Sequence, residues 1–87
     1  MQTHELKIKP EHFDPVFTGV KTAELRINDR GYKAGDLLKL REFSNGDYTG
    51  SYVWRRVTHV ADVGDLSEGY VLLSMTPATL FDTARAA

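Results

Sequence analysis

The sequence predicts one small α+β domain, a β-barrel of about five strands with one N-terminal helix. Its length of 87 residues suits a single domain. Several short stretches alternate apolar and polar residues, which is typical of half-buried strands. Turn signals such as Asn45-Gly46 separate these stretches and join neighbouring strands. We place the domain at residues 1–76 and interpret residues 77–87 as a C-terminal tail or a short C-terminal helix.

The first two predicted elements are a strand and a helix. Residues 4–8 alternate and predict a strand with one buried face. Residues 10–19 predict a short helix, because apolar side chains recur there at a spacing of three and four. Pro10 suits the first helical turn and Gly19 suits the position just after the helix. Pro15 removes a backbone donor, so it predicts a kink or a late helix start.

Four further strands follow, at residues 22–27, 36–43, 48–63 and 70–75. Asn45-Gly46 indicates a type I′ hairpin between the second and third of these. Gly50 indicates a bend or bulge in the long strand. The last strand is apolar on both faces, as a central strand would be. Residues 76–86 predict a last short helix, capped by Thr76 with Pro77 at its first position.

Composition excludes several classes of site. The chain has no Cys, so disulfides, thiolate zinc sites and Cys nucleophiles are excluded. The His residues have no second ligand at a suitable spacing, so we predict no metal and no cofactor. No apolar run approaches the length of about 18 residues that a membrane span needs. The N-terminus has no apolar segment of a secretory signal, so we expect a cytoplasmic protein.

The net charge of −1 conceals an asymmetry along the chain. Residues 21–56 carry eight Lys or Arg against five acidic residues, whereas residues 57–87 are acidic. A basic centre is suited to a polyanion, and an ordinary mixed solvated surface explains it equally well.

One stretch, "GVKTAELRINDRGYKAGD" at residues 19–36, concentrates polar groups that could carry chemistry. Glu24 and Arg26 are two positions apart in a predicted strand, so they share a face about 6.6 Å apart. They can form an ion pair or line a pocket together. Lys21 follows the predicted helix and either offsets its negative end or serves a function. Asn28 and Asp29 fix the turn that follows or contribute to the pocket.

This stretch resembles the signature of the ASCH domains, a branch of the PUA-like β-barrel superfamily. Their Gly-x-Lys-x-x-Glu/Thr-x-Arg pattern is met by Gly19, Lys21, Glu24 and Arg26. The stretches "HELKI", "NDRGYKAGD", "LREF", "YTG" and "GYVLLSM" are similar to a subgroup of small phage and bacterial proteins catalogued as DUF3850. The resemblance covers residues 3–76 and implies a PUA-like barrel with a cleft near Lys21, in a bacterial cell or a phage-infected host.

The resemblance and the residues together favour a binding module for single-stranded RNA or a nucleoside, including a modified one. Tyr52 and Trp54 share a strand face with Arg56 and could stack on unpaired bases, although ordinary core packing explains Trp54 better. Arg55 or Arg56 and Lys33 would touch phosphates. The residues predicted to bind the ligand are Lys21, Glu24, Arg26, Asn28, Asp29, Tyr52 and Arg56.

Two alternatives stay open. The first is a small amidohydrolase or ribonuclease that acts on N4-acetylcytidine-like nucleosides or on RNA, with Lys21 as general base, as the resemblance implies. Its catalytic residues would be Lys21, Thr22 and Glu24. The family's nucleophilic Thr is replaced by Glu24, which argues against this reading, although Thr22 could substitute and Glu68 could supply a distant carboxylate. The second is an interaction protein made by a phage against a host protein partner.

Overall fold

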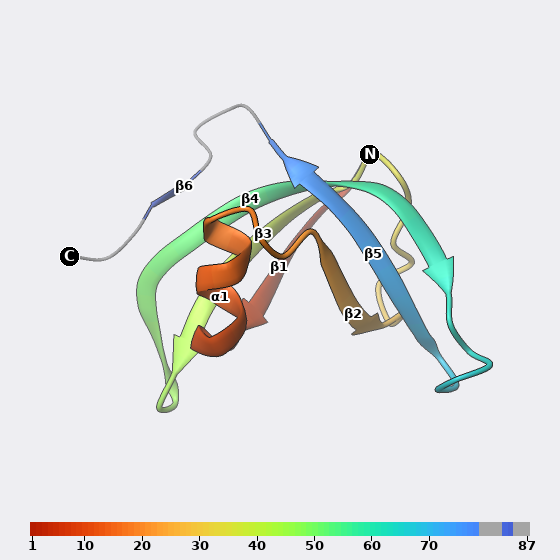
Figure 1. The fold of residues 1–87 in the computed structure, drawn as a ribbon, viewed down its shortest axis with the longest axis horizontal. Helices are drawn as coiled ribbons and strands as arrows, with labels where there is room; N and C mark the ends of the chain where they lie inside the picture. The colour runs from red at the N-terminus through yellow and green to blue at the C-terminus, as the bar shows by residue number, and fades with distance from the viewer. Residues whose placement is uncertain (79–82, 85–87) are drawn as a thin grey trace.

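The computed structural model describes residues 1–78 and, as backbone, residues 83–84; it shows a sheet curled into a half-open barrel with one short helix (Figure 1). The helix lies inside the curl of the sheet. The elements are β1 (Thr3–Ile8), α1 (Pro10–Phe17), β2 (Ala23–Ile27), β3 (Leu37–Ser44), β4 (Asp47–Asp62), β5 (Tyr70–Pro77) and β6 (Thr83–Ala84). The prediction of about five strands and an N-terminal helix is confirmed.

The order of the strands explains why the barrel is half-open. It runs β1-β3-β4-β5-β2, with β6 paired to β4. β1 and β3 are parallel, and the other pairs are antiparallel. β1 and β2 are therefore the two ends of the sheet. In the described part of the chain they form no ladder with each other, so a gap remains where a closed barrel would have its last pair.

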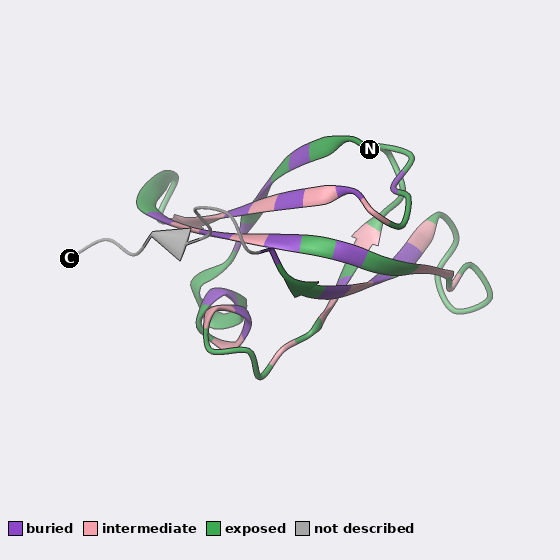
Figure 2. Ribbon diagram, turned by 90° about the horizontal axis from the view of Figure 1, so that it is seen from above, coloured by how far each residue is buried: buried purple, intermediate pink, exposed green. Residues whose placement is uncertain are grey.

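The core fills the concave side of the sheet. Every second side chain is buried along β1, in the first half of β3 and along β5 up to Met75, and Figure 2 shows this alternation as coloured bands along the strands. Phe13 and Val16 of α1 are fully buried against this face. Each large apolar side chain removed from water contributes about 1.5–3 kcal/mol. The largest fully buried side chains are Phe13, Leu38, Leu40, Leu73, Val16, Val53 and Val57.

The ends of α1 follow the predicted signals. Pro10 occupies the first turn, and Gly19 has a φ of +85°, which glycine adopts without strain. The helix begins at Pro10 although Pro15 lies inside it, so the prediction of a late start is wrong. Near its end, the buried Arg55 of β4 donates a 2.7 Å hydrogen bond from Nη2 to the carbonyl of Val16. The Val16 carbonyl also accepts a 3.0 Å hydrogen bond from the Gly19 N–H, so Arg55 joins β4 to the C-terminal end of the helix.

The hairpin and the bulge lie where the sequence predicts them. Asn45 and Gly46 have φ values of +53° and +82°, which is the type I′ pattern. On the β4 side, three residues separate Tyr48 from Tyr52, whereas one residue separates their partners on β3. This bulge contains Gly50, whose φ is +94°. Bulges increase local twist and bend the strand, which helps the 16-residue β4 to wrap round the core.

The prediction of a C-terminal helix at residues 76–86 is wrong for Thr76, Pro77, Thr83 and Ala84, which the structure places in strands. β5 continues through Thr76 and Pro77, which pair with Arg56 and Arg55 of β4. Thr83–Ala84 is a strand, and the other residues from 79 onwards lie outside the described part of the chain. Sheet pairing overrides the capping signal here, and Pro is tolerated because it stands at the end of its strand.

No helix in the described part of the chain is long and apolar enough to cross a membrane.

Candidate ligand-binding site

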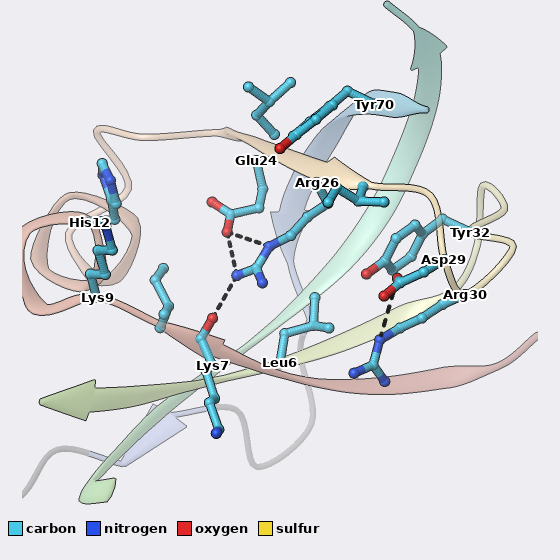
Figure 3. Close-up of a pocket in the computed structure, with 13 residues that line it drawn as sticks. Leu6, Lys7, Lys9, His12, Glu24, Arg26, Asp29, Arg30, Tyr32 and Tyr70 are labelled. Carbon is cyan, nitrogen blue, oxygen red and sulfur yellow. Dashed lines mark hydrogen bonds and ion pairs between the residues drawn. The ribbon is translucent and has the colours of Figure 1, made fainter. Parts of the chain in front are cut away.

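A cavity of about 410 Å³ lies at the gap between β1 and β2 (Figure 3). The two edge strands form opposite walls. The rest of the cavity lining comes from α1, the loop after β2 and the start of β5. Ligand pockets in proteins usually have volumes of this order and combine apolar walls with a few polar groups. The residues that line it are Leu6, Lys7, Ile8, Lys9, His12, Glu24, Leu25, Arg26, Ile27, Asp29, Arg30, Tyr32 and Tyr70.

β2 presents its polar face to the inside of the molecule. Glu24 is buried, with 7% of its surface exposed, and Arg26 is half-buried. Leu25 and Ile27 point the other way and are 56% and 54% exposed. This is the reverse of an ordinary amphipathic strand. A buried carboxylate is costly unless it is paired and hydrogen-bonded, so its surroundings must compensate for it.

Two cations compensate for the Glu24 carboxylate. Lys21 Nζ lies 2.7 Å from Oε1 and also donates to the carbonyl of Ala23. Arg26 donates to Oε2 from Nε at 2.9 Å and from Nη2 at 2.6 Å. Charge-assisted and bidentate contacts of this kind are short and directional. Glu24 therefore fixes the positions of both cations, which suits a positioning residue better than a group exposed to a ligand.

Arg26 also connects the two edges of the sheet. Its Nη2 donates a 2.7 Å hydrogen bond to the backbone carbonyl of Lys7 in β1. Figure 3 shows the guanidinium lying between Glu24 and this carbonyl. Within the described residues, its Nη1 has no hydrogen-bond partner. Arg26 is therefore held rigidly at the cavity, with N–H groups on Nη1 that could donate to a ligand.

Tyr32 supplies a second polar group. The residue is 5% exposed, and its hydroxyl has no hydrogen-bond partner in the part of the chain that the structure describes. Figure 3 shows this hydroxyl on the cavity side of the ring. Burial raises the pKa of Tyr32, against the opposing effect of the positive charges of Arg26 and Arg30. Buried polar groups are normally hydrogen-bonded, so an unpaired one beside a cavity indicates a ligand or a water.

A buried pair behind Tyr32 holds the loop in place. The rings of Tyr32 and His4 meet edge to face, 4.8 Å apart. His4 Nε2 lies 2.9 Å from Asp36 Oδ2, and Asp36 accepts hydrogen bonds from the backbone N–H groups of Gln2 and Lys33. Burial would raise the pKa of Asp36, but these hydrogen bonds and His4 outweigh it and lower the pKa to about 2. His4 and Asp36 thus have a structural role that positions Tyr32.

The structure gathers only some of the predicted site residues at this cavity. Glu24, Arg26 and Asp29 line it. Lys21 lies behind Glu24 and is not part of the lining. Thr22 is exposed and is not part of the lining either. Asn28 accepts a hydrogen bond from the Tyr32 backbone and, with Glu68, lines a separate cavity of about 390 Å³.

Tyr52 and Arg56 lie away from the cavity. They alternate along β4 with the buried Val53, Arg55 and Val57, so they are on the outer face of the sheet. Arg56 donates to the carbonyl of Gly35, and Arg55 is buried at the end of α1. One ligand in the cavity cannot reach Tyr52 or Arg56 directly. The seven predicted residues therefore do not meet at this cavity, because β4 turns Tyr52 and Arg56 outward.

The residues that β1, α1 and β5 bring to the cavity were not among those predicted from the sequence to bind a ligand. Lys9, His12, Tyr32 and Tyr70 line the cavity, and none of these four is among the residues that the sequence predicted to bind the ligand. The alternation in residues 4–8 indicated which face of β1 turns inward. Nothing in the sequence indicated that β1 lies opposite β2. Among the described residues, no group of three or more His, Asp or Glu gathers as a metal site would require.

Comparison with known proteins identifies the family. A family model described as "Domain of unknown function (DUF3850)" matches residues 3–75. An "Uncharacterized 12.9 kDa protein in GpA 3'region" of Escherichia phage P2 is 47% identical over 70 residues. The alignment spans 80% of this chain and 64% of that protein, so the chain corresponds to less than two thirds of the length of its relative. On the match to nearly its whole length, the chain belongs to the DUF3850 family.

Proposed function

We propose that the cavity between β1 and β2 binds a base of single-stranded RNA or a nucleoside, including one with a modified base. One observation carries this proposal. The buried Tyr32 hydroxyl and Arg26 Nη1 both lie at the cavity, and neither has a partner among the described residues. The edge of a base offers carbonyl oxygens and ring nitrogens that such groups can satisfy.

The walls of the cavity suit the flat faces of a base. Leu6 and Ile8 of β1 line one side, and Tyr70 of β5 lines another. Aromatic rings stack on bases, and aliphatic side chains cover the rest of the ring. Since Glu24 fixes the guanidinium of Arg26, the donor is oriented before the ligand arrives, which lowers the entropy cost of binding.

The rim of the cavity is basic. Lys9, His12 and Arg30 line it, and Asp29 lies 3.9 Å from Arg30. Lys and Arg at the rim can contact phosphates while the deeper groups read the base, so that phosphate contacts position and base contacts specify. The proposal therefore extends from a free nucleoside to a nucleotide within an RNA strand.

We include in this proposal the relation to the ASCH branch of the PUA-like superfamily that the Gly19–Arg26 pattern implies. Hydrolysis is less well supported than binding. Lys21, the general base of that alternative, donates to Glu24 and to the Ala23 carbonyl, and a protonated amine in such contacts is a poor base. Thr22 and Glu68 do not line this cavity.

The test is a titration of the whole chain with nucleosides and short RNAs, including N4-acetylcytidine, followed by NMR shifts and product chromatography. We expect shifts to cluster at residues 6–9 and 24–32, with no product. Tyr32→Phe removes only the hydroxyl and should weaken binding about fivefold, since one hydrogen bond contributes about 1 kcal/mol. Ser67→Ala, which removes an exposed hydroxyl in the loop before β5, is the control.

The titration distinguishes binding from hydrolysis and from the absence of a nucleoside site. Binding that Tyr32→Phe weakens and Ser67→Ala leaves unchanged supports the proposal. Product that disappears in Lys21→Ala would show hydrolysis and favour the alternative. Absence of both shifts and product would refute a nucleoside site and leave a protein partner as the remaining reading.

A further inference from the structure

The outer face of the sheet carries a second group of residues, which the cavity does not use. Four aromatic side chains lie there at least partly exposed, although the core is on the opposite side. They come from adjacent strands, because Phe43 pairs with Tyr48, Arg41 with Tyr52 and Lys39 with Trp54. We call this surface the aromatic-basic face; its rings are Phe43, Tyr48, Tyr52 and Trp54, and its cations are Lys7, Lys39 and Arg41.

The cations of this face lie on its rings. Lys39 Nζ is 4.6 Å from the ring centre of Tyr52 and 5.7 Å from that of Trp54. Arg41 Cζ is 3.7 Å from the ring centre of Tyr48, and Lys7 Nζ is 4.4 Å from that of Phe43. Rings and positive charges thus alternate over three strands, β1, β3 and β4. A solvated sheet face needs polar residues, but it does not need four rings interleaved with cations.

We propose that the aromatic-basic face binds single-stranded RNA, with unpaired bases stacked on its rings and phosphates contacted by its cations. Proteins that hold single strands combine stacking platforms with basic side chains in this way. An exposed cation–π contact is weaker than a stacked base. A base can therefore displace Lys39 or Arg41 from a ring, and the released cation can move to a phosphate. A duplex is excluded because its bases are already stacked.

The charges favour a ribose strand as the occupant. The cations outnumber Glu5, the carboxylate that lies among them, 3.1 Å from Arg41. Glu5 repels phosphate, yet it can accept a hydrogen bond from a 2′-hydroxyl, which only RNA offers. Lys7 links the two surfaces, because its backbone carbonyl borders the cavity while its ammonium lies on the outer face. The proposal nevertheless stands on the outer face alone.

The experiment is a titration of the full chain with a short oligouridylate, read by the anisotropy of the labelled strand and by tryptophan fluorescence. Trp54 is the one Trp of the sequence, so its emission reports on this face directly. We expect quenching, and an affinity that falls as salt is raised. Tyr52→Leu should weaken binding roughly 5- to 150-fold, the equivalent of one lost base stack, whereas Tyr52→Phe should stay within about twofold.

Charge variants and other strands complete the test. Lys39→Gln should reduce the salt slope by about one, and Asp65→Asn, which removes an exposed charge in the loop before β5, should not change it. The proposal is overturned if Tyr52→Leu binds oligouridylate as tightly as the wild type, or if the wild type does not bind oligouridylate. It is also overturned if a DNA single strand or an RNA duplex binds with the same affinity. Tyr32→Phe separates this face from the cavity. Weaker nucleoside binding with unchanged oligouridylate binding supports the outer face, whereas equal weakening of both would place the oligouridylate in the cavity and overturn the proposal.

Discussion

Replacement of Glu24 by Gln tests whether the polar inner face of β2 is a desolvated network. Gln keeps the shape of the side chain but removes the negative charge to which both Lys21 and Arg26 donate hydrogen bonds. Loss of one partner of a buried ion pair costs about 3–5 kcal/mol, and loss of an exposed pair costs about 0–1 kcal/mol. The side chains of Lys21 and Arg26 are 27% and 23% exposed, which lies between these cases. We therefore expect a loss of about 2 kcal/mol in the free energy of unfolding.

The assay is urea unfolding followed by circular dichroism and Trp54 fluorescence. For a chain of this size, a loss of about 2 kcal/mol also lowers the melting temperature by about 10 °C. Glu5→Gln is the matched control, because it removes the same charge from the exposed Glu5–Arg41 pair and should change stability by less than about 0.5 kcal/mol. Equal losses of stability from the two substitutions would show that Glu24 is solvated and that the inner face of β2 is not a desolvated network.

Two further predictions concern the parts that support the site. Because the pKa of Asp36 is lowered from 3.8 to about 2, its contribution to stability is present above pH 3.8 and is lost as the pH falls towards about 2. Acid unfolding should therefore show a shallower loss over this range in Asp36→Asn than in the wild type, and identical slopes would contradict the role of Asp36. Arg55→Leu should cost about 1–3 kcal/mol, because it removes the buried, charge-assisted hydrogen bond to the Val16 carbonyl. Arg56→Leu, on the outer face, should cost much less, and equal losses in urea unfolding would show that the assignment of the two faces is wrong.

Local signals in the sequence determined most of the elements. The type I′ hairpin at Asn45-Gly46 requires positive φ at both positions, and these two residues tolerate it at low cost, so the turn could be read without any tertiary information. The bulge at Gly50 and the Pro10 and Gly19 ends of α1 are local in the same sense. The C-terminal signal at Thr76 and Pro77 failed because pairing with β4, a contact between distant residues, stabilises a strand there instead.

The site shows the same division between local and distant information. The spacing of Glu24 and Arg26 placed them on one face of a strand, and their ion pair follows from the two-residue repeat. Three features depended on how the sheet curls: that β1 stands opposite β2, that Arg26 reaches the Lys7 carbonyl across the gap, and that Tyr32 is buried beside it. The curl also separates Tyr52 and Arg56 from the cavity. Which side chains share a strand face depends on the two-residue backbone repeat, so it can be predicted from the sequence alone. Which faces meet depends on the order and twist of strands far apart in the chain, so only the folded sheet shows it.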